Sequence, residues 1–122
     1  MIPKIVHQIW VGPCRPPTQL IATWQQMAAE FGWEHKLWRD ADIDEFGLQN
    51  KAICDVEDWT AKCDVARHEI LLRHGGMYAD CDFQWEPGVD IAKALNFDQA
   101  EFCLTTEQDL RWAKMGFVDH KG

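Results

Sequence analysis

The chain has 122 residues, of which 47% are hydrophobic, and it carries 7 Trp and 6 Phe. This composition excludes a disordered chain and fits one domain built around one core. The formal net charge of −8 argues against a protein that binds nucleic-acid phosphates, because such proteins present a basic face. A small anionic ligand is compatible with this charge, since a bound divalent cation would supply positive charge locally.

The 5 cysteines are spread along the chain, and no two of them form a C-x-x-C pair. Their odd number and their spacing argue against a disulfide framework or a structural zinc site, and reduced thiols favour a cytoplasmic location. No apolar run approaches the roughly 18 residues of a membrane span. The first residues lack the apolar stretch of a signal peptide, so we expect neither a membrane span nor a secretion leader.

The first part of the chain predicts a strand, a helix and a second strand. The segment KIVHQIWVG, residues 4–12, is rich in β-branched and aromatic residues and ends at Gly-Pro, which indicates a buried strand that runs into a loop. Residues 18–31 show apolar side chains at helical spacing, with Thr18 as the expected N-cap and Gly32 as the stop. The alternating segment WEHKLW, residues 33–38, predicts the second strand.

The second part of the chain predicts a strong helix followed by a strand. The expected elements are a weak helix over 52–59, a strong helix over 60–74, a strand over 77–83, a turn over 86–88, a short helix over 91–95 and a strand over 100–106. The strong helix is expected to bury a stripe of Ala61, Val65 and Leu72, and Gly75 to end it in the left-handed conformation. The alternation of strands and helices predicts one α/β domain over residues 1–122, with a mostly parallel sheet.

Three D-x-D triplets occur in the chain, at residues 40–42, 42–44 and 80–82. Aspartate is frequent enough here for such a triplet to arise by chance, so its context has to distinguish one triplet from another. The first two lie in the polar run 39–47, which we expect to be a loop or the start of a short helix. Acids at the first turn of a helix interact favourably with the helix dipole, which is sufficient to explain these two triplets.

The third triplet differs because it lies in an apolar run. In a strand, Tyr78, Asp80 and Asp82 would share one face, and the apolar residues between them would share the other. Ligands bind at strand ends in open α/β sheets, and two adjacent carboxylates repel each other unless a cation or a proton lies between them. Mg²⁺ and Mn²⁺ prefer such oxygen ligands. The alternative is a surface strand whose acids form salt bridges.

Asp64 and Arg67 lie three residues apart in the expected strong helix and therefore share one of its faces. Taken on the residues alone, they form an ordinary intrahelical ion pair worth about 0.2–0.5 kcal/mol. The spacing by itself favours this structural role over a role in binding.

Three segments, in this order, resemble the glycosyltransferases with a DXD sugar-binding region: IPKIVHQIWVG at 2–12, HKLWRDADI at 35–43 and AKCDVARHEILLRHGGMYADCDF at 61–83. This family includes the yeast initiating α-1,6-mannosyltransferase and capsular polysaccharide glycosyltransferases. The third segment is the most specific, with an Asp-x-x-Arg helix, a Gly-Gly turn and then Tyr-x-Asp-x-Asp. The resemblance covers most of residues 2–87. Members have a longer catalytic domain, so the resemblance implies a domain whose C-terminal part is missing.

The resemblance implies a GT-A-like (Rossmann-like) fold that binds a nucleotide-sugar. It also implies a metal-dependent, retaining hexosyltransferase of carbohydrate biosynthesis, with Mn²⁺ or Mg²⁺ as the cofactor. Such an enzyme moves a sugar from a UDP- or GDP-sugar to a saccharide, a glycan or another hydroxyl acceptor. The chemistry requires stabilisation of the charge that builds on the leaving diphosphate, and a divalent ion supplies this as a Lewis acid.

The resemblance assigns four residues to the nucleotide-sugar donor. Trp10 would stack on the base, although on the residues alone a tryptophan in the core is the alternative. Asp64 and Arg67 would contact the donor sugar, and Tyr78 would lie near the nucleotide or pack beneath it.

Two further residues would combine donor and metal binding. Asp80 would hold the ribose and sugar region with help from the metal, and Asp82 would bind the metal directly. His7 and Gln8 belong to the first segment, and we expect structural roles for them. No catalytic nucleophile is evident in the sequence, and we assign none.

Three other functions are compatible with parts of the pattern. A glycoside hydrolase also uses two carboxylates, but usually from separate strands about 5–10 Å apart. A haloacid-dehalogenase-type phosphatase carries its D-x-D directly after the first strand, whereas Asp80 lies late in this chain. The third alternative is an incomplete domain that binds a nucleotide-sugar or a partner without transferring sugar.

Overall fold

The computed structural model describes residues 2–50, 59–97 and 113–115, the last of these by backbone only. In chain order the elements are β1 (Ile5–Ile9), α1 (Thr18–Phe31), β2 (Glu34–Trp38), α2 (Asp40–Phe46), α4 (Trp59–His74), β3 (Met77–Tyr78), β4 (Phe83–Trp85), α5 (Ile91–Ala94) and β5 (Ala113–Met115). The weak helix expected over 52–59 falls outside the described residues except at Trp59, where α4 begins. The strand expected over 100–106 also lies outside them.

The main sheet has three parallel strands in the order β2-β1-β3. A second, two-stranded sheet pairs β4 with β5 in antiparallel fashion. The expectation of an α/β domain with a mostly parallel sheet is thus confirmed for the described residues.

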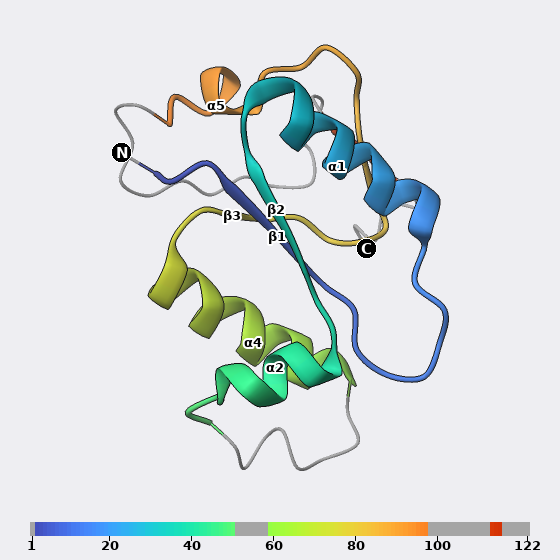
Figure 1. The fold of residues 1–122 in the computed structure, drawn as a ribbon, viewed down its shortest axis with the longest axis vertical. Coiled ribbons are helices and arrows are strands. Elements are labelled where there is room, and N and C mark those ends of the chain that lie inside the picture. The colour runs from blue at the N-terminus through green and yellow to red at the C-terminus, as the bar shows by residue number, and fades with distance from the viewer. Residues whose placement is uncertain (1, 51–58, 98–112, 116–122) are drawn as a thin grey trace, which may run out of the picture.

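Helices cover both faces of the main sheet, as Figure 1 shows, with α1 on one side and α2 with α4 on the other. Successive residues of β1 point to opposite faces, so Val6 packs with Trp24 of α1, while Ile9 packs with Ile43 of α2 and Ile70 of α4. β1 is thus a central parallel strand buried on both faces, and its two polar residues, His7 and Gln8, are buried with the apolar ones.

The helix α1 forms as its apolar spacing predicts, with Trp24 and Met27 fully buried. Its N-cap is Pro17, and no side chain caps the helix, so the expected capping by Thr18 is wrong. Proline is tolerated at this end because the first N–H groups of a helix have no partner within it. Gly32 ends α1 in the left-handed conformation, as expected.

The buried stripe of α4 differs from the expected one. Ala66 and Ile70 are buried, Val65 is only partly buried, and Leu72 is 88% exposed. The helix therefore meets β1 through side chains four residues apart, which lie on one helical face. Gly75 follows with φ +69° and donates its N–H to the Leu71 carbonyl, as expected for a left-handed C′ residue.

The segment 77–83 is not one strand, and this expectation is wrong. β3 ends at Tyr78, and a turn closed by a hydrogen bond from Phe83 N to Asp80 O (3.1 Å) leads into β4. The pairing with β1 lasts only two residues, because the chain then crosses toward α1, against which β4 packs. The alternation of burial survives the turn: Ala79, Cys81 and Phe83 are buried, while Asp80 and Asp82 are partly exposed.

Gly76 allows β3 to lie directly beside β1. Its φ is +94°, and a Cβ at this position would lie 2.5 Å from the carbonyl oxygen of Ile5. No other residue type accommodates both the backbone conformation and the contact. The Gly-Gly turn is therefore what places the Asp80 turn at the end of β1.

Two polar side chains of β1, His7 and Gln8, are buried and hydrogen-bonded. Trp38 Nε1 donates to His7 Nδ1 (3.1 Å), so the hydrogen of the neutral imidazole is on Nε2, which lies 2.9 Å from the Gly75 carbonyl. Burial lowers the pKa of His7, in agreement with this neutral form. These contacts agree with a structural role.

Gln8 links the edge strand β2 to the Asp80 turn. Its amide nitrogen donates to the Asp80 carbonyl (3.3 Å), and its oxygen lies 2.9 Å from His35 Nε2. Both functions of a fully buried amide are thus satisfied, as burial requires.

Candidate functional site

A cleft of about 450 Å³ opens at the carboxyl ends of β1 and β3. All six residues that the resemblance assigned to the donor or its metal ion line it: Trp10, Asp64, Arg67, Tyr78, Asp80 and Asp82. They come from the end of β1, the first half of α4, and β3 with the turn that follows it. Ligands bind at this edge of open α/β sheets, so the cleft is the candidate functional site.

One wall of the cleft is a face of α4. Its lining residues are Trp59, Thr60, Cys63, Asp64 and Arg67, and their spacing places them along one side of the helix. The Asp64 and Arg67 side chains form the expected ion pair, with Arg67 Nη2 3.2 Å from Asp64 Oδ1. The pair is therefore an intrahelical salt bridge that also faces the cleft.

Arg67 connects this wall to the acidic turn. Its guanidinium carbon lies 5.4 Å from the centre of the Tyr78 ring, in the range of a cation–π contact. The Tyr78 hydroxyl in turn interacts with the Asp80 carboxylate. Asp64, Arg67, Tyr78 and Asp80 thus form a continuous polar surface from α4 to the turn after β3.

The acidic turn raises the proton affinity of the groups around it. Burial, and then the neighbouring Asp80 carboxylate, raise the pKa of Tyr78. The same two causes raise the pKa of the Cys81 thiol to about 12, and Cys63 is shifted upward by burial and by Asp64 and Asp80. Cys63 and Cys81 are therefore neutral thiols at neutral pH, and with Cys14 they are free cysteines.

The opposite wall is the end of β1. Trp10 is absent from both buried clusters and lies on the cleft, so the alternative of a core tryptophan does not apply. Its backbone N–H donates to Trp38 O (2.9 Å), its carbonyl accepts from Arg39 Nε (2.8 Å), and its indole donates to Cys14 O (2.8 Å). The Trp10 backbone is thus held by two hydrogen bonds and its indole ring by one.

The carboxylates of Asp80 and Asp82 fit a particular kind of metal site. Among the described residues, no group of three or more His, Cys, Asp or Glu side chains is arranged to hold an ion. Mg²⁺ is usually bound by one or two carboxylates together with substrate phosphates and water, rather than by a complete protein cage. Two carboxylates on the cleft match that arrangement and would need a phosphate ligand to complete it.

The sequence reading missed Trp59, Thr60 and Cys63. Trp59 is 44% exposed, and its ring lies against Gly12, where a Cβ would come within 3.2 Å of it. The helical spacing from Asp64 and Arg67 back to Trp59 was the available signal, because these residues share a helix face. Thr60 and Cys63 lie within the helix expected over 60–74, and Trp59 lies one residue before it, but neither the spacing nor the resemblance had assigned these residues a role.

The fold and the cleft together define a class of structure: an α/β domain with a polar cleft at the carboxyl end of a parallel sheet, the edge at which such folds bind ligands. Aromatic, acidic and guanidinium groups line the cleft, as expected for a ligand with a flat ring, hydroxyl groups and, with a metal, phosphates.

Comparison with known proteins narrows this class. The chain is 32% identical to the uncharacterized glycosyltransferase L373 of Acanthamoeba polyphaga mimivirus over 90 residues, which cover 67% of this chain and 36% of that protein. It is 29% identical to inositol phosphoceramide mannosyltransferase 1 of Schizosaccharomyces pombe over 125 aligned residues, which cover 96% of this chain and 38% of that protein. These similarities support a relationship to glycosyltransferases.

The chain spans little more than a third of the length of the two curated relatives it matches. No protein-family model matches the sequence, and no solved structure matches it. Within the described residues, no helix is both long enough and apolar enough to cross a membrane.

Proposed function

We propose that this chain contains the donor site of a metal-dependent, retaining glycosyltransferase with a GT-A-like fold, which moves a hexose from a UDP- or GDP-sugar to a saccharide or other hydroxyl acceptor. One observation carries the proposal: the six residues that the family resemblance assigned to the donor and its metal ion line a single cleft. They are separated by up to 72 positions in the sequence, so the fold rather than the chain order brings them together.

In this proposal the base lies against Trp10, whose indole and backbone are held by hydrogen bonds. Asp64 accepts hydrogen bonds from sugar hydroxyls, and Arg67 donates to them. Their mutual ion pair and the contact of Arg67 with Tyr78 orient both groups before the donor binds, which lowers the ordering cost of binding.

Asp80 and Asp82 would hold Mn²⁺ or Mg²⁺ against the diphosphate. When bound, the ion supplies Lewis-acid stabilisation of the negative charge on the leaving group. The acidic chain needs such an ion to accept an anionic donor. The name of the fission-yeast relative makes mannose the first sugar to test.

The test is thermal stability with UDP or GDP, with and without Mn²⁺, on the wild type, Asp82→Ala and the matched control Asp44→Ala. Asp44 is an exposed acid outside the cleft. A ligand at about 100 times its dissociation constant stabilises the folded state by roughly 2.7 kcal/mol. We expect a metal-dependent shift with one of the nucleotides in the wild type and in Asp44→Ala, and no shift in Asp82→Ala.

A cooperative melt that neither nucleotide shifts would contradict the donor site. If the shift is present, incubation with a radiolabelled nucleotide-sugar distinguishes an enzyme from a domain that only binds. Release of free sugar that requires Mn²⁺ and is lost in Asp82→Ala supports transfer chemistry, whereas binding without turnover supports the non-catalytic alternative.

A further inference from the structure

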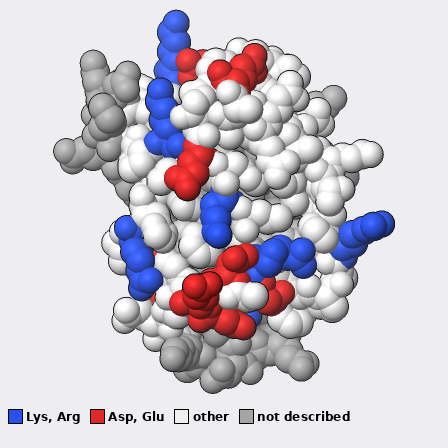
Figure 2. All heavy atoms as spheres, viewed as in Figure 1, with Lys and Arg blue, Asp and Glu red and all other residues white. Residues whose placement is uncertain are grey.

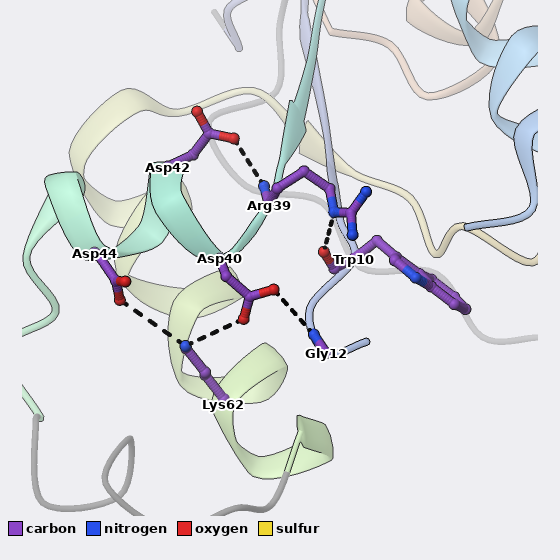
Figure 3. Close-up of polar contacts among 7 residues, drawn as sticks. All are labelled: Trp10, Gly12, Arg39, Asp40, Asp42, Asp44 and Lys62. Atoms are coloured by element: carbon purple, nitrogen blue, oxygen red, sulfur yellow. Dashed lines mark hydrogen bonds and ion pairs between the residues drawn. The ribbon is translucent and has the colours of Figure 1, made fainter. Parts of the chain in front are cut away.

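The carboxylate of Asp40 joins three segments of the chain that are distant in sequence. Asp40 is the first residue of α2; its Oδ2 accepts a hydrogen bond from the backbone N–H of Gly12 (3.0 Å), and its Oδ1 lies 3.5 Å from Lys62 Nζ. Gly12 follows β1, and Lys62 belongs to the first turn of α4. Figure 3 shows the Asp40 side chain between these two partners. We call these contacts the Asp40 bridge.

Each partner of the bridge adjoins one wall of the cleft. Gly12 lies two residues after Trp10, and Lys62 directly precedes Cys63 and Asp64 on α4. Arg39, the residue before Asp40, also contacts the wall that Gly12 adjoins, because its Nε donates a hydrogen bond to the Trp10 carbonyl. The start of α2 thus contacts both walls without itself lining the cleft.

The bridge differs from the other acidic contacts of α2. Figure 2 shows carboxylates gathered over this region with basic side chains beside them. Asp42 pairs with Lys36, and Asp44 lies 4.0 Å from Lys62 with its side chain 77% exposed. Exposed ion pairs of this kind contribute little. The Lys62 side chain is 12% exposed and is shared by Asp40 and Asp44, and the Asp40 side chain is itself 39% exposed. What distinguishes Asp40 among these three acids is the hydrogen bond from the backbone N–H of Gly12, beyond the end of β1.

We propose that Asp40 is a positioning residue, which fixes the Trp10–Gly12 segment against α4 and so sets the width of the cleft where the base of the donor binds. This inference rests on the proposed function. Asp40 acts through Trp10 and does not itself contact the ligand. The alternative is that Asp40 only interacts with the dipole of α2. In that case, loss of its contacts with Gly12 and Lys62 would not change the affinity for the ligand.

The experiment measures the dissociation constants of UDP or GDP, and of inorganic pyrophosphate, each with Mn²⁺, by isothermal titration calorimetry. The proteins are the wild type, Asp40→Ala and the control Asp44→Ala. For Asp40→Ala we expect binding of the nucleoside diphosphate to weaken about tenfold, the cost of ordering about one freed backbone residue when the base binds, while pyrophosphate binding stays unchanged. For Asp44→Ala we expect wild-type values for both ligands.

Two further variants separate positioning from a general loss of structure. Asp40→Asn keeps an oxygen acceptor for Gly12 and loses only the charge, so we expect it to recover part of the affinity. In a Trp10→Ala background, Asp40→Ala should add no further loss, because two residues that act through one contact are not additive. Equal weakening of both ligands, or additive losses, would overturn the inference.

Hydrogen exchange distinguishes a failure of this inference from a failure of the proposed function. The Gly12 amide should exchange faster in Asp40→Ala than in the wild type or in Asp44→Ala, whether or not a nucleotide binds. If the wild type binds no nucleotide, the donor site is refuted, and with it a role for Asp40 in binding. If Gly12 exchange is unchanged, the bridge itself is refuted.

Discussion

Two acidic regions of this protein share the letters D-x-D and differ in almost everything else. At the start of α2, Asp40, Asp42 and Asp44 each lie within 4.0 Å of a lysine. In the turn after β3, Asp80 adjoins the Tyr78 hydroxyl and two thiols, whose pKa values are raised first by burial and then by nearby carboxylates, Asp80 among them. The acids of the first region thus lie beside lysines, whereas Asp80 lies beside a hydroxyl and two thiols at the edge of a cleft.

The comparison shows that the surroundings of a short acidic motif are determined by the backbone structure in which it lies. The α2 acids lie on a helical turn, where lysines from β2 and α4 reach them. The second pair lies where a parallel strand ends and the chain turns toward another sheet. Three substitutions test this contrast, in decreasing order of expected effect.

The largest effect is expected at the Gly-Gly turn that positions the second region. Gly76→Ala places a Cβ 2.5 Å from the Ile5 carbonyl oxygen, at a backbone with φ +94°. The added atom has to displace β3 from β1, so we expect a loss of about 3 kcal/mol or more in the free energy of unfolding. Urea denaturation measures it.

The matched control is Gly47→Ala at the end of α2. Gly47 also has a positive φ of +75°, but a Cβ there would meet no atom within 4 Å. Only the backbone strain applies, so we expect a loss of about 1–2 kcal/mol. Equal losses in the two variants would show that close packing of β3 on β1 is not what holds the acidic turn.

The second effect concerns alkaline pH. The pKa of Cys81 is raised from 9.0 to about 12, first by burial and then by Asp80. A raised pKa favours the neutral thiol in the folded state, so its stabilising contribution is complete below pH 9 and is lost as the pH rises toward 12. Cys81→Ala should therefore flatten the decline in unfolding free energy over this interval, by roughly 2–4 kcal/mol.

Urea denaturation between pH 8 and the alkaline limit of cooperative folding, about pH 11, follows this decline. The control Cys14→Ala removes an exposed thiol and should leave the slope unchanged. If the wild type and Cys81→Ala lose stability in parallel, burial and the neighbouring carboxylates do not raise the pKa of this thiol as inferred.

The smallest effect is expected in the first region. Asp42→Asn removes the charge that lies 3.7 Å from Lys36, but keeps an oxygen to accept the Arg39 N–H at the helix start. Since the ion pair is exposed, we expect a loss below about 0.5 kcal/mol, which should disappear in 1 M NaCl, where the screening length is about 3 Å. A loss of more than about 1 kcal/mol in the free energy of unfolding that persists in 1 M NaCl would contradict the view that the acids of α2 form only weak, exposed ion pairs.

The elements with a clear period could be predicted from the sequence. The first strand, α1 and the second strand follow from β-branched content, helical spacing and alternation, and α4 was expected within one residue of its start. The turn at Asp80 could not be predicted, because it depends on where β3 stops pairing with β1. That point is set by tertiary contacts from His7 and Gln8.

The residues that line the candidate site could be predicted, but the contacts that hold its walls in place could not. The family resemblance supplied the six residues from Trp10 to Asp82, and the structure places them on one cleft; their roles remain predictions. The contact between Asp40 and Gly12 could not be predicted, because the two residues lie 28 positions apart and nothing in the local pattern joins them. Trp59 was missed for a related reason, since its membership of the site depends on the exact start of a helix.

The alternating burial of the turn after β3 has a consequence for the entropy of ligand binding. Ala79, Cys81 and Phe83 are buried, so each acid of the triplet lies between two anchored neighbours. The backbone that carries both carboxylates is therefore ordered before any ligand arrives. If a ligand bound to a flexible acidic loop, ordering the loop would cost about 1–2 kcal/mol of conformational entropy per residue. Here the same residues are already ordered in the folded protein, so ligand binding does not carry this cost.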